Sequence, residues 1–240
     1  MATQILLAID TIDMAIAGAQ AAATRGAVDG IKLGLEFFAA NGPAGVRAVA
    51  APGGPLFLDL KLHDIPNTVA GAVRAATPLR PTLLTVHAAG GSAMLRAAAD
   101  AAGEASAKAG VPRPRIIGVT VLTSLGESDI EAVGQRGPIA DQARRLAALA
   151  QSCGLDGVVC SPHEIAALRA DRGAGFLLVV PGIRPAWAAA GDQKRVMTPA
   201  EAARLGADYL VIGRPITAAE DPAAAARRIA AEVVAAAPAA

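Results

Sequence analysis

The sequence predicts a (β/α)8 barrel, an α/β fold made by one domain over residues 1–240. A chain of 240 residues has the usual length of one such barrel. Short apolar runs alternate with Ala- and Leu-rich stretches, and no Pro/Gly/Ser linker divides them. Hydrophobic residues form 53% of the chain and aromatic residues only 2%, so the core must consist of the small and branched side chains that suit layered barrel packing.

Eight runs have the length and composition of buried strands. They are Gln4–Asp10, Gly30–Leu33, Leu56–Lys61, Leu83–His87, Ile116–Thr120, Gly157–Cys160, Phe176–Val180 and Tyr209–Ile212. The stretches compatible with helix include Asp13–Arg25, Ser92–Ala109, Ile139–Ser152, Pro162–Leu168 and Pro199–Leu205. Thr198 is placed to cap the last of these, with Pro199 at its first position. Pro222–Ala236 is expected to be a surface helix packed through Ala and Val.

A doubly wound open sheet is the alternative fold. Such a sheet normally has a Gly-rich phosphate turn after its first strand, whereas this chain has Asp10-Thr11-Ile12 there. Six polar residues instead lie at or just past the carboxyl ends of different predicted strands: Asp10, Lys32, Asp59, Lys61, His87 and Thr123. In a barrel these ends form the active face, so we expect a site there.

Charge and cysteine content limit the classes of function. The 22 Lys and Arg residues balance 21 Asp and Glu, which argues against a nucleic-acid or polybasic membrane surface. The first residues lack a basic region, and their apolar run is too short for a signal peptide or a membrane span, so we expect a cytoplasmic protein. Cys153 and Cys160 form no C-x-x-C pattern, so we expect buried free thiols and neither a metal site nor a redox motif.

The run Asp59-Leu60-Lys61-Leu62-His63-Asp64 is the strongest chemical motif. Because side chains alternate in a strand, Asp59 and Lys61 should both face the barrel mouth, about 6.6 Å apart along the strand. Leu58 and Leu60 would then face the helices. Asp64 falls in the following loop, where Asn67 or Thr68 is a candidate helix cap.

Lys32 ends the neighbouring predicted strand, and adjacent strands lie about 4.8 Å apart. An alternating array of Lys32, Asp59, Lys61 and Asp64 is therefore sterically reasonable. An ordinary salt-bridge network at the rim is the alternative interpretation, since such networks are common.

A second cluster follows the last two strands. Pro181-Gly182-Ile183-Arg184 and Gly213-Arg214 occupy the two loops that commonly bind phosphate in barrels, since glycine lets backbone N–H groups approach an anion and arginine offers paired donors. The long polar connection from Pro185 to Met197 is expected to be a lid. For Gly213-Arg214-Pro215 alone, a turn with a solvated arginine is the alternative.

The three histidines are scattered along the chain and do not predict a metal site. His87 is compatible with a role in the site and equally with a histidine at the rim that only bonds to the backbone. His63 should point away from Asp59 and Lys61 by alternation, and His163 follows Ser161-Pro162 at a helix start.

The stretch from Phe57 to Val69 resembles the signature of the orotidine 5'-phosphate decarboxylase family. Further segments resemble the family in the same order along the chain: Leu7–Asp10, the Lys32 segment, Thr85–Ala88, Val119–Ser124, Pro181–Arg184 and Gly206–Ile216.

The resemblance implies a cofactor-free decarboxylation of orotidine 5'-monophosphate to UMP in pyrimidine biosynthesis. Lys61 would be the proton donor, with Lys32 and Asp59 as its neighbours. It also implies a homodimer in which Asp64, the fourth member of the array, and Thr68 reach the partner subunit's site.

The resemblance further implies that Arg184 and Arg214 hold the substrate phosphate and that Gln193 bridges phosphate and pyrimidine. The remaining residues expected to contact substrate are Asp10, Lys32, Asp59, Ile65, Thr68, His87, Thr123, Pro181 and Gly213. Two alternatives stay open. One is a sugar-phosphate decarboxylase or hexulose-phosphate aldolase that uses Mg²⁺ on the same carboxylates, and the other is a phosphate-ligand sensor without catalysis.

Overall fold

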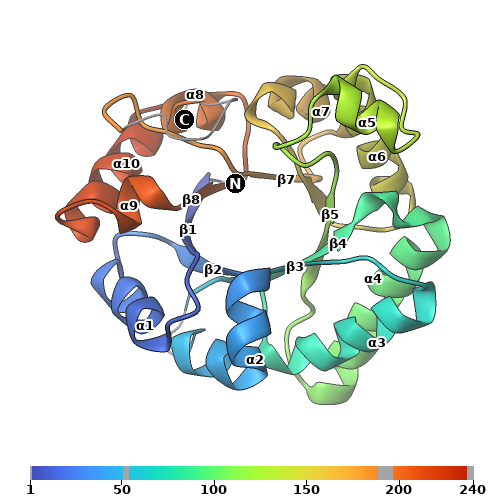
Figure 1. Ribbon diagram of the computed structural model, residues 1–240, viewed down its shortest axis with the longest axis horizontal. Helices are drawn as coiled ribbons and strands as arrows, with labels where there is room; N and C mark the ends of the chain where they lie inside the picture. Colours follow the sequence, from blue (N-terminus) through green and yellow to red (C-terminus); the bar gives the residue numbers. More distant parts are fainter. Residues whose placement is uncertain (1, 51–53, 189–196, 237–240) are drawn as a thin grey trace.

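The computed structural model describes residues 2–50, 54–188 and 197–236. Its strands are all parallel and form a closed barrel in the order β1 to β8, with β8 returning to pair with β1 (Figure 1). The strands are β1 (Gln4–Ile9), β2 (Gly30–Gly34), β3 (Leu56–Leu62), β4 (Leu83–His87), β5 (Arg115–Val119), β6 (Gly157–Val159), β7 (Leu177–Val180) and β8 (Tyr209–Ile212). The barrel prediction is confirmed, and the open sheet is excluded.

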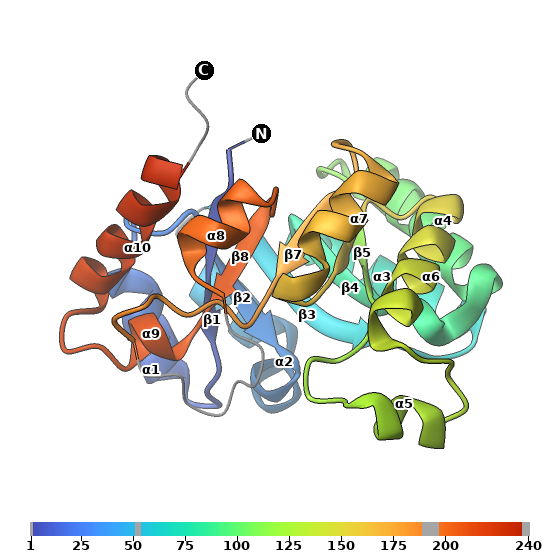
Figure 2. The same ribbon diagram turned by 90° about the horizontal axis from the view of Figure 1, so that it is seen from above.

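The helices surround the barrel, and α10 lies between α8 and α9 in Figure 1. They are α1 (Met14–Ala23), α2 (Leu35–Ala50), α3 (Pro66–Ala76), α4 (Gly91–Ala109), α5 (Glu127–Ala132), α6 (Ile139–Ser152), α7 (Ile165–Arg172), α8 (Pro199–Arg204), α9 (Arg214–Thr217) and α10 (Pro222–Ala236), with short 3₁₀ turns at Thr77–Leu79, Ala88–Gly90 and Pro162–Glu164. Figure 2 shows α5 on the side of the barrel opposite to the start of β1. The carboxyl ends of the strands lie on this α5 side.

Alternation of side chains along the strands produces two apolar layers. Leu6, Phe57 and Leu83 belong to a small cluster inside the barrel. Their neighbours Leu7, Leu58 and Leu84 belong to the larger cluster shared with the helices. Leu58 and Leu60 therefore face the helices, as predicted, which leaves the inner face of β3 available for polar side chains at its carboxyl end.

The predicted strand bounds agree with the structure to within one residue at either end. Thr198 caps α8 as expected, and Glu201 completes a capping box. The expected cap of α3 by Asn67 or Thr68 is wrong, because Pro66 occupies the first helical position and Ile65 precedes it without a side-chain cap.

The stretch Pro162–Leu168 begins as a 3₁₀ turn, and the α-helix itself starts only at Ile165. The helix α10 has the predicted bounds and buries Ala225, Ala226, Ile229 and Val233. Cys153 and Cys160 are buried free thiols, as expected. Among the described residues, no helix combines the length and apolar character needed to cross a bilayer.

Candidate active site

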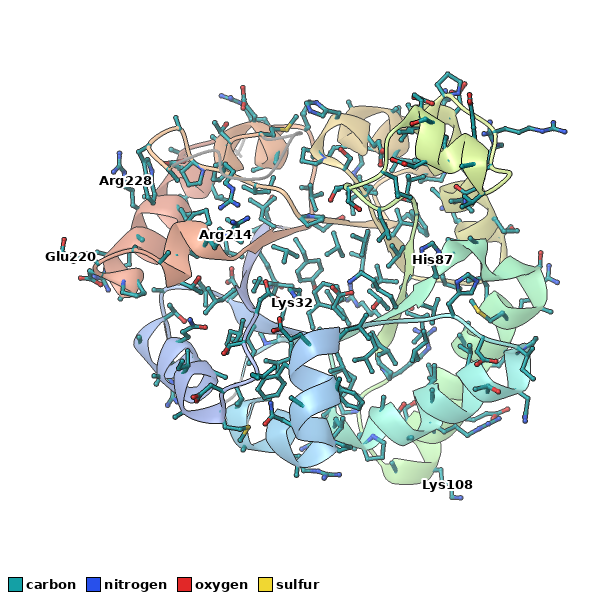
Figure 3. The ribbon with its side chains drawn as sticks, in the orientation of Figure 1. Lys32, His87, Lys108, Arg214, Glu220 and Arg228 are labelled. Atoms are coloured by element: carbon teal, nitrogen blue, oxygen red, sulfur yellow. The ribbon has the colours of Figure 1, made fainter. Side chains whose placement is uncertain are left out.

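A cavity of about 290 Å³ opens at the carboxyl ends of the strands, close to the lower limit of about 300 Å³ for small-molecule sites. Nine of the predicted site residues line it: Asp10, Lys32, Asp59, Lys61, Thr123, Pro181, Arg184, Gly213 and Arg214. They come from strands or loops on different sides of the barrel. In Figure 3, Lys32 and Arg214 lie toward the centre of the ring.

Two ion pairs form one end of the cavity. Lys61 Nζ lies 2.6 Å from Asp59 Oδ2, and Lys32 Nζ lies 2.9 Å from Asp10 Oδ1. The residues Lys32 and Asp59 are nearly buried, at 9% and 8% exposed. Lys32 thus pairs with Asp10, and the cavity of this chain holds three of the four residues of the expected array. Asp64 is exposed, and its Oδ1 accepts a hydrogen bond from the backbone N–H of Ile65.

Gly34 gives Lys32 the space for this position. A Cβ atom at Gly34 would lie only 3.1 Å from Lys32 Nζ, closer than most real contacts of a Cβ atom. A side chain there would crowd the ammonium group, which would have to shift by a few tenths of an ångström. Gly34 was not predicted as a site residue, although it directly follows the predicted strand Gly30–Leu33, which contains Lys32.

Lys61 reaches the cavity through an irregular backbone rather than a plain strand. Its φ angle is 49°, in the left-handed region that a side-chain-bearing residue rarely adopts. The pairing of β3 with β4 shifts register between Leu58 and Leu62. The expectation that Lys61 and Asp59 share the mouth of the barrel is confirmed, but strict alternation is not the complete reason.

Thr85 connects these two residues and was not identified as a site residue from sequence. Its side chain points inward from β4 and is fully buried. Thr85 Oγ1 donates to Asp59 Oδ1 at 3.0 Å and accepts from the backbone N–H of Lys61 at 2.8 Å. Alternation along the strand could have identified Thr85: it lies two positions after Leu83, which faces the barrel interior, so its side chain should face the interior too.

Arg184 and Arg214 also line the cavity and follow β7 and β8, on the other side of the closed barrel from β3. Gly182 has a φ angle of 79°, which permits the turn that leads to Arg184. The backbone N–H of Arg184 then donates to Met197 O at 2.9 Å, which ties together the two ends of the connection from Pro185 to Met197. Two guanidinium groups at one end of a cavity suit an anionic group of the ligand.

Four predicted site residues are absent from the lining of this cavity: Asp64, predicted as catalytic, and Ile65, Thr68 and His87, predicted to bind substrate. The first three are exposed on the loop after β3 and the first turn of α3. Gln193, and most of the expected lid, lie outside the described residues. Phe57, Val121 and Cys160 line the cavity without having been predicted to do so.

His87 packs against His63 instead of facing the ion pairs. The two rings stack with centroids 5.1 Å apart, and the backbone N–H of Ala89 donates to His87 Nδ1 at 3.4 Å. Burial lowers the pKa of His87 from its usual 6.5, and the neighbouring His63 and Lys61 lower it further. The interpretation of His87 as a rim histidine bound to backbone fits this geometry better than substrate contact.

Cys160 is a buried thiol on the wall of the cavity. Burial raises the pKa of this thiol well above its usual value, and the carboxylate of Glu164 raises it further. Cys160 is therefore a neutral wall residue rather than a nucleophile. Within the part of the chain that the structure describes, no three His, Cys, Asp or Glu side chains gather as a set of metal ligands.

The chain matches the sequence pattern of the orotidine 5'-phosphate decarboxylase / HUMPS family over residues 3–229. The chain belongs to this family. An orotidine 5'-phosphate decarboxylase from Paramagnetospirillum magneticum is 58% identical over 233 residues, which cover 97% of this chain and 99% of the relative. One from Rhodospirillum rubrum is also 58% identical, with 96% and 94% covered.

The barrel of this family member also resembles a solved structure. The crystal structure of orotidine 5'-phosphate decarboxylase from Lactobacillus acidophilus superposes with a TM-score of 0.84 at 36% identity, covering 97% of this chain and 99% of the other. The resemblance seen in short segments of the sequence therefore extends over nearly the whole orotidine 5'-phosphate decarboxylase fold.

Proposed function

We propose that this chain is a carboxy-lyase that converts orotidine 5'-monophosphate to UMP and CO₂ in pyrimidine biosynthesis. The observation that carries the proposal is the two-ended cavity. The Lys61–Asp59 pair comes from β3, with the Lys32–Asp10 pair beside it, and Arg184 and Arg214 follow β7 and β8 on the other side of the closed barrel from β3. The pyrimidine carboxylate would lie at the ion pairs and the phosphate at the two arginines.

Lys61 is the proposed proton donor. The substrate carboxylate is attached to C6 of the pyrimidine ring. When the bond between them breaks, CO₂ leaves and the electron pair of that bond remains on C6. No group in the substrate ring accepts that pair covalently, so a fixed positive charge close to C6 must stabilise it. The ammonium group of Lys61 supplies this charge and then transfers its proton to C6, and solvent returns a proton to the amine.

Asp59 has a smaller direct effect on the barrier. Two like charges about 4 Å apart repel each other by around 4 kcal/mol at an effective dielectric of 20. Enzymes lower barriers by roughly 8–23 kcal/mol. Repulsion between Asp59 and the substrate carboxylate is therefore a contribution, and stabilisation of the carbanion by Lys61 must supply most of the effect.

Binding of the phosphate far from C6 supplies energy that can be used at the reacting carbon. Arg184 and Arg214 are the proposed phosphate ligands. Asp10, Lys32, Thr123, Pro181 and Gly213 also line the cavity and are the further residues proposed to contact substrate. Gln193 as a bridge between phosphate and pyrimidine, and closure of a lid, stay predictions.

A homodimer is part of the proposal, with Asp64 and Thr68 entering the partner subunit's site. The support is the exposure of this segment and of apolar side chains around it. Ile65 and Ile12, in the loops after β3 and β1, and Leu35, the first residue of α2, are 67%, 59% and 54% exposed. Large apolar side chains grouped at one rim favour a protein contact there. A cytoplasmic location stays a prediction.

Replacing Lys61 by alanine tests the assignment directly. The variant should lose UMP formation, followed by the absorbance change of orotidine 5'-monophosphate, while UMP binding measured by calorimetry stays detectable. Turnover that persists in Lys61→Ala would remove Lys61 from the role of proton donor. The wild-type assay should be run with and without EDTA, because loss of activity on chelation would favour the Mg²⁺-dependent alternative.

A further inference from the structure

Thr85 forms a closed ring of hydrogen bonds with the two residues at the chemical end of the cavity. Thr85 Oγ1 contacts the backbone nitrogen of Lys61 at 2.8 Å and Asp59 Oδ1 at 3.0 Å. The second oxygen of the same carboxylate, Asp59 Oδ2, contacts Lys61 Nζ at 2.6 Å. Both ends of Lys61, its backbone and its ammonium group, are thus connected through Thr85 and Asp59.

The direction of each hydrogen bond in the ring follows from chemistry. A backbone N–H can only donate, so the Thr85 oxygen is the acceptor toward Lys61. The single hydroxyl hydrogen of Thr85 is then left for Asp59 Oδ1, which makes Asp59 an acceptor on this side. The ammonium group of Lys61 donates to the other carboxylate oxygen. Every donor in the ring has one acceptor, and an apolar side chain at position 85 would break two of its contacts.

The strained backbone of Lys61 explains why the ring is needed. A left-handed conformation is unfavourable for a residue with a side chain and persists only where neighbouring contacts hold it. The register shift between β3 and β4 removes regular pairing at this point, and Thr85 supplies a side-chain acceptor for the Lys61 N–H in its place. Loss of the hydroxyl would let the backbone relax toward a regular strand, and the ammonium group would move with it.

We propose that Thr85 is a positioning residue for the decarboxylation, which fixes the Lys61 ammonium group and the Asp59 carboxylate in the geometry of the chemical step. The inference rests on the proposed function. It concerns a side chain that does not line the cavity, so its effect should appear in turnover rather than in substrate binding.

The test compares Thr85→Val with Thr85→Ser. Valine keeps the shape and burial of threonine but removes the hydroxyl, and serine keeps the hydroxyl. Thr77→Val is the matched control, because Thr77 is also fully buried and its hydroxyl donates to Val73 O at the end of α3, away from the cavity. We expect kcat of Thr85→Val to fall on the order of 10- to 100-fold, the usual effect of a misplaced reacting group. The Kd for UMP should change less than about threefold.

Thr85→Ser should recover most of kcat, and Thr77→Val should match the wild type in kcat while losing thermal stability comparable to Thr85→Val. The proposal fails if Thr85→Val keeps kcat within about twofold, or if serine and valine are equally impaired. If Thr85→Val does not fold, Thr85→Ser against Thr85→Cys poses the same question, since a thiol is a weaker donor of similar size. Wild-type turnover is measured first, so that failure of the proposed function is recognised separately.

Discussion

Replacing Arg214 should weaken substrate binding, whereas replacing Lys61 should abolish turnover. Arg214 follows β8, on the other side of the closed barrel from Lys61, so Arg214→Ala should raise KM for orotidine 5'-monophosphate by about 10- to 100-fold, the equivalent of one charge-assisted hydrogen bond. The affinity for uridine, which lacks phosphate, should not change. Steady-state kinetics and calorimetry measure the two quantities. Arg204→Ala, an exposed arginine at the end of α8, is the control, and an equal loss of uridine affinity would contradict the assignment.

His87 should make the stability of the protein depend on pH. Its pKa in the folded state lies below 6.5, because burial and then His63 and Lys61 disfavour the charged ring. The unfolded chain therefore binds more protons between the folded pKa and 6.5, so the free energy of unfolding should fall as pH drops through this window. Urea unfolding at a series of pH values measures it.

His87→Gln should flatten this dependence, and His63→Gln should raise the pKa of His87 as observed by NMR titration. His163→Gln is the matched control, since His163 is exposed in the turn before α7. A stability profile that keeps the same slope in His87→Gln would contradict the argument.

Site residues could be predicted from the sequence where a charged side chain lies at the end of a predicted strand. Asp10, Lys32 and Lys61 are charged residues at the ends of apolar runs, so the barrel rule was enough to place them. Thr85 was missed because threonine is common in strands for its shape alone. The conformation of Lys61 was also missed, since a left-handed residue in a strand depends on a contact from β4 that no local pattern encodes.

At the scale of secondary structure, the connection after β7 is fixed to α10 through Trp187. Its Nε1–H donates to Glu232 Oε1 at 2.9 Å, and the guanidinium carbon of Arg228 lies 4.6 Å from the ring centroid. Figure 3 shows Arg228 at the outer edge of the molecule. Trp187→Phe should lower the free energy of unfolding by roughly 1–2 kcal/mol, because the phenyl ring still packs under Arg228 but cannot donate to Glu232. Urea unfolding monitored by circular dichroism measures the loss.

Arg228→Gln and Arg227→Gln form a matched pair for this contact. Consecutive residues on a helix point about 100° apart, so only the change at Arg228 should shift the emission of Trp187, the single tryptophan of the chain. Equal shifts in both variants would contradict the stacked geometry.

Helices and strands were predicted unequally well. The strands are short apolar runs buried on both faces, so the first and last apolar residues of each run mark where the strand begins and ends. Helix starts depend on single side chains, and at α3 the fixed φ of Pro66 outweighed the polar candidates Asn67 and Thr68. The 3₁₀ turn at Pro162–Glu164 likewise reflects local backbone geometry that the apolar spacing does not specify.

For the whole molecule, the proposed homodimer leads to a complementation experiment. Chains with Asp64→Ala and chains with Lys61→Ala should each be inactive or nearly so. In a mixed dimer, one site receives both intact residues, so mixing should restore about half the activity of a wild-type dimer for each heterodimer formed. Size-exclusion chromatography with light scattering measures the oligomer. Mixed chains that stay inactive would contradict the entry of Asp64 into the partner's site.

The pairing of β1 with β8 sets when the site can exist during synthesis of the chain. Lys32, Asp59 and Lys61 leave the ribosome early, whereas Arg214 follows the last strand of the barrel. Until β8 has emerged, β1 and β7 each lack a neighbour, and the two halves of the cavity are not held opposite each other. A nascent chain therefore has its charged residues long before it has a site, and its open strand edges need protection from aggregation until the barrel closes.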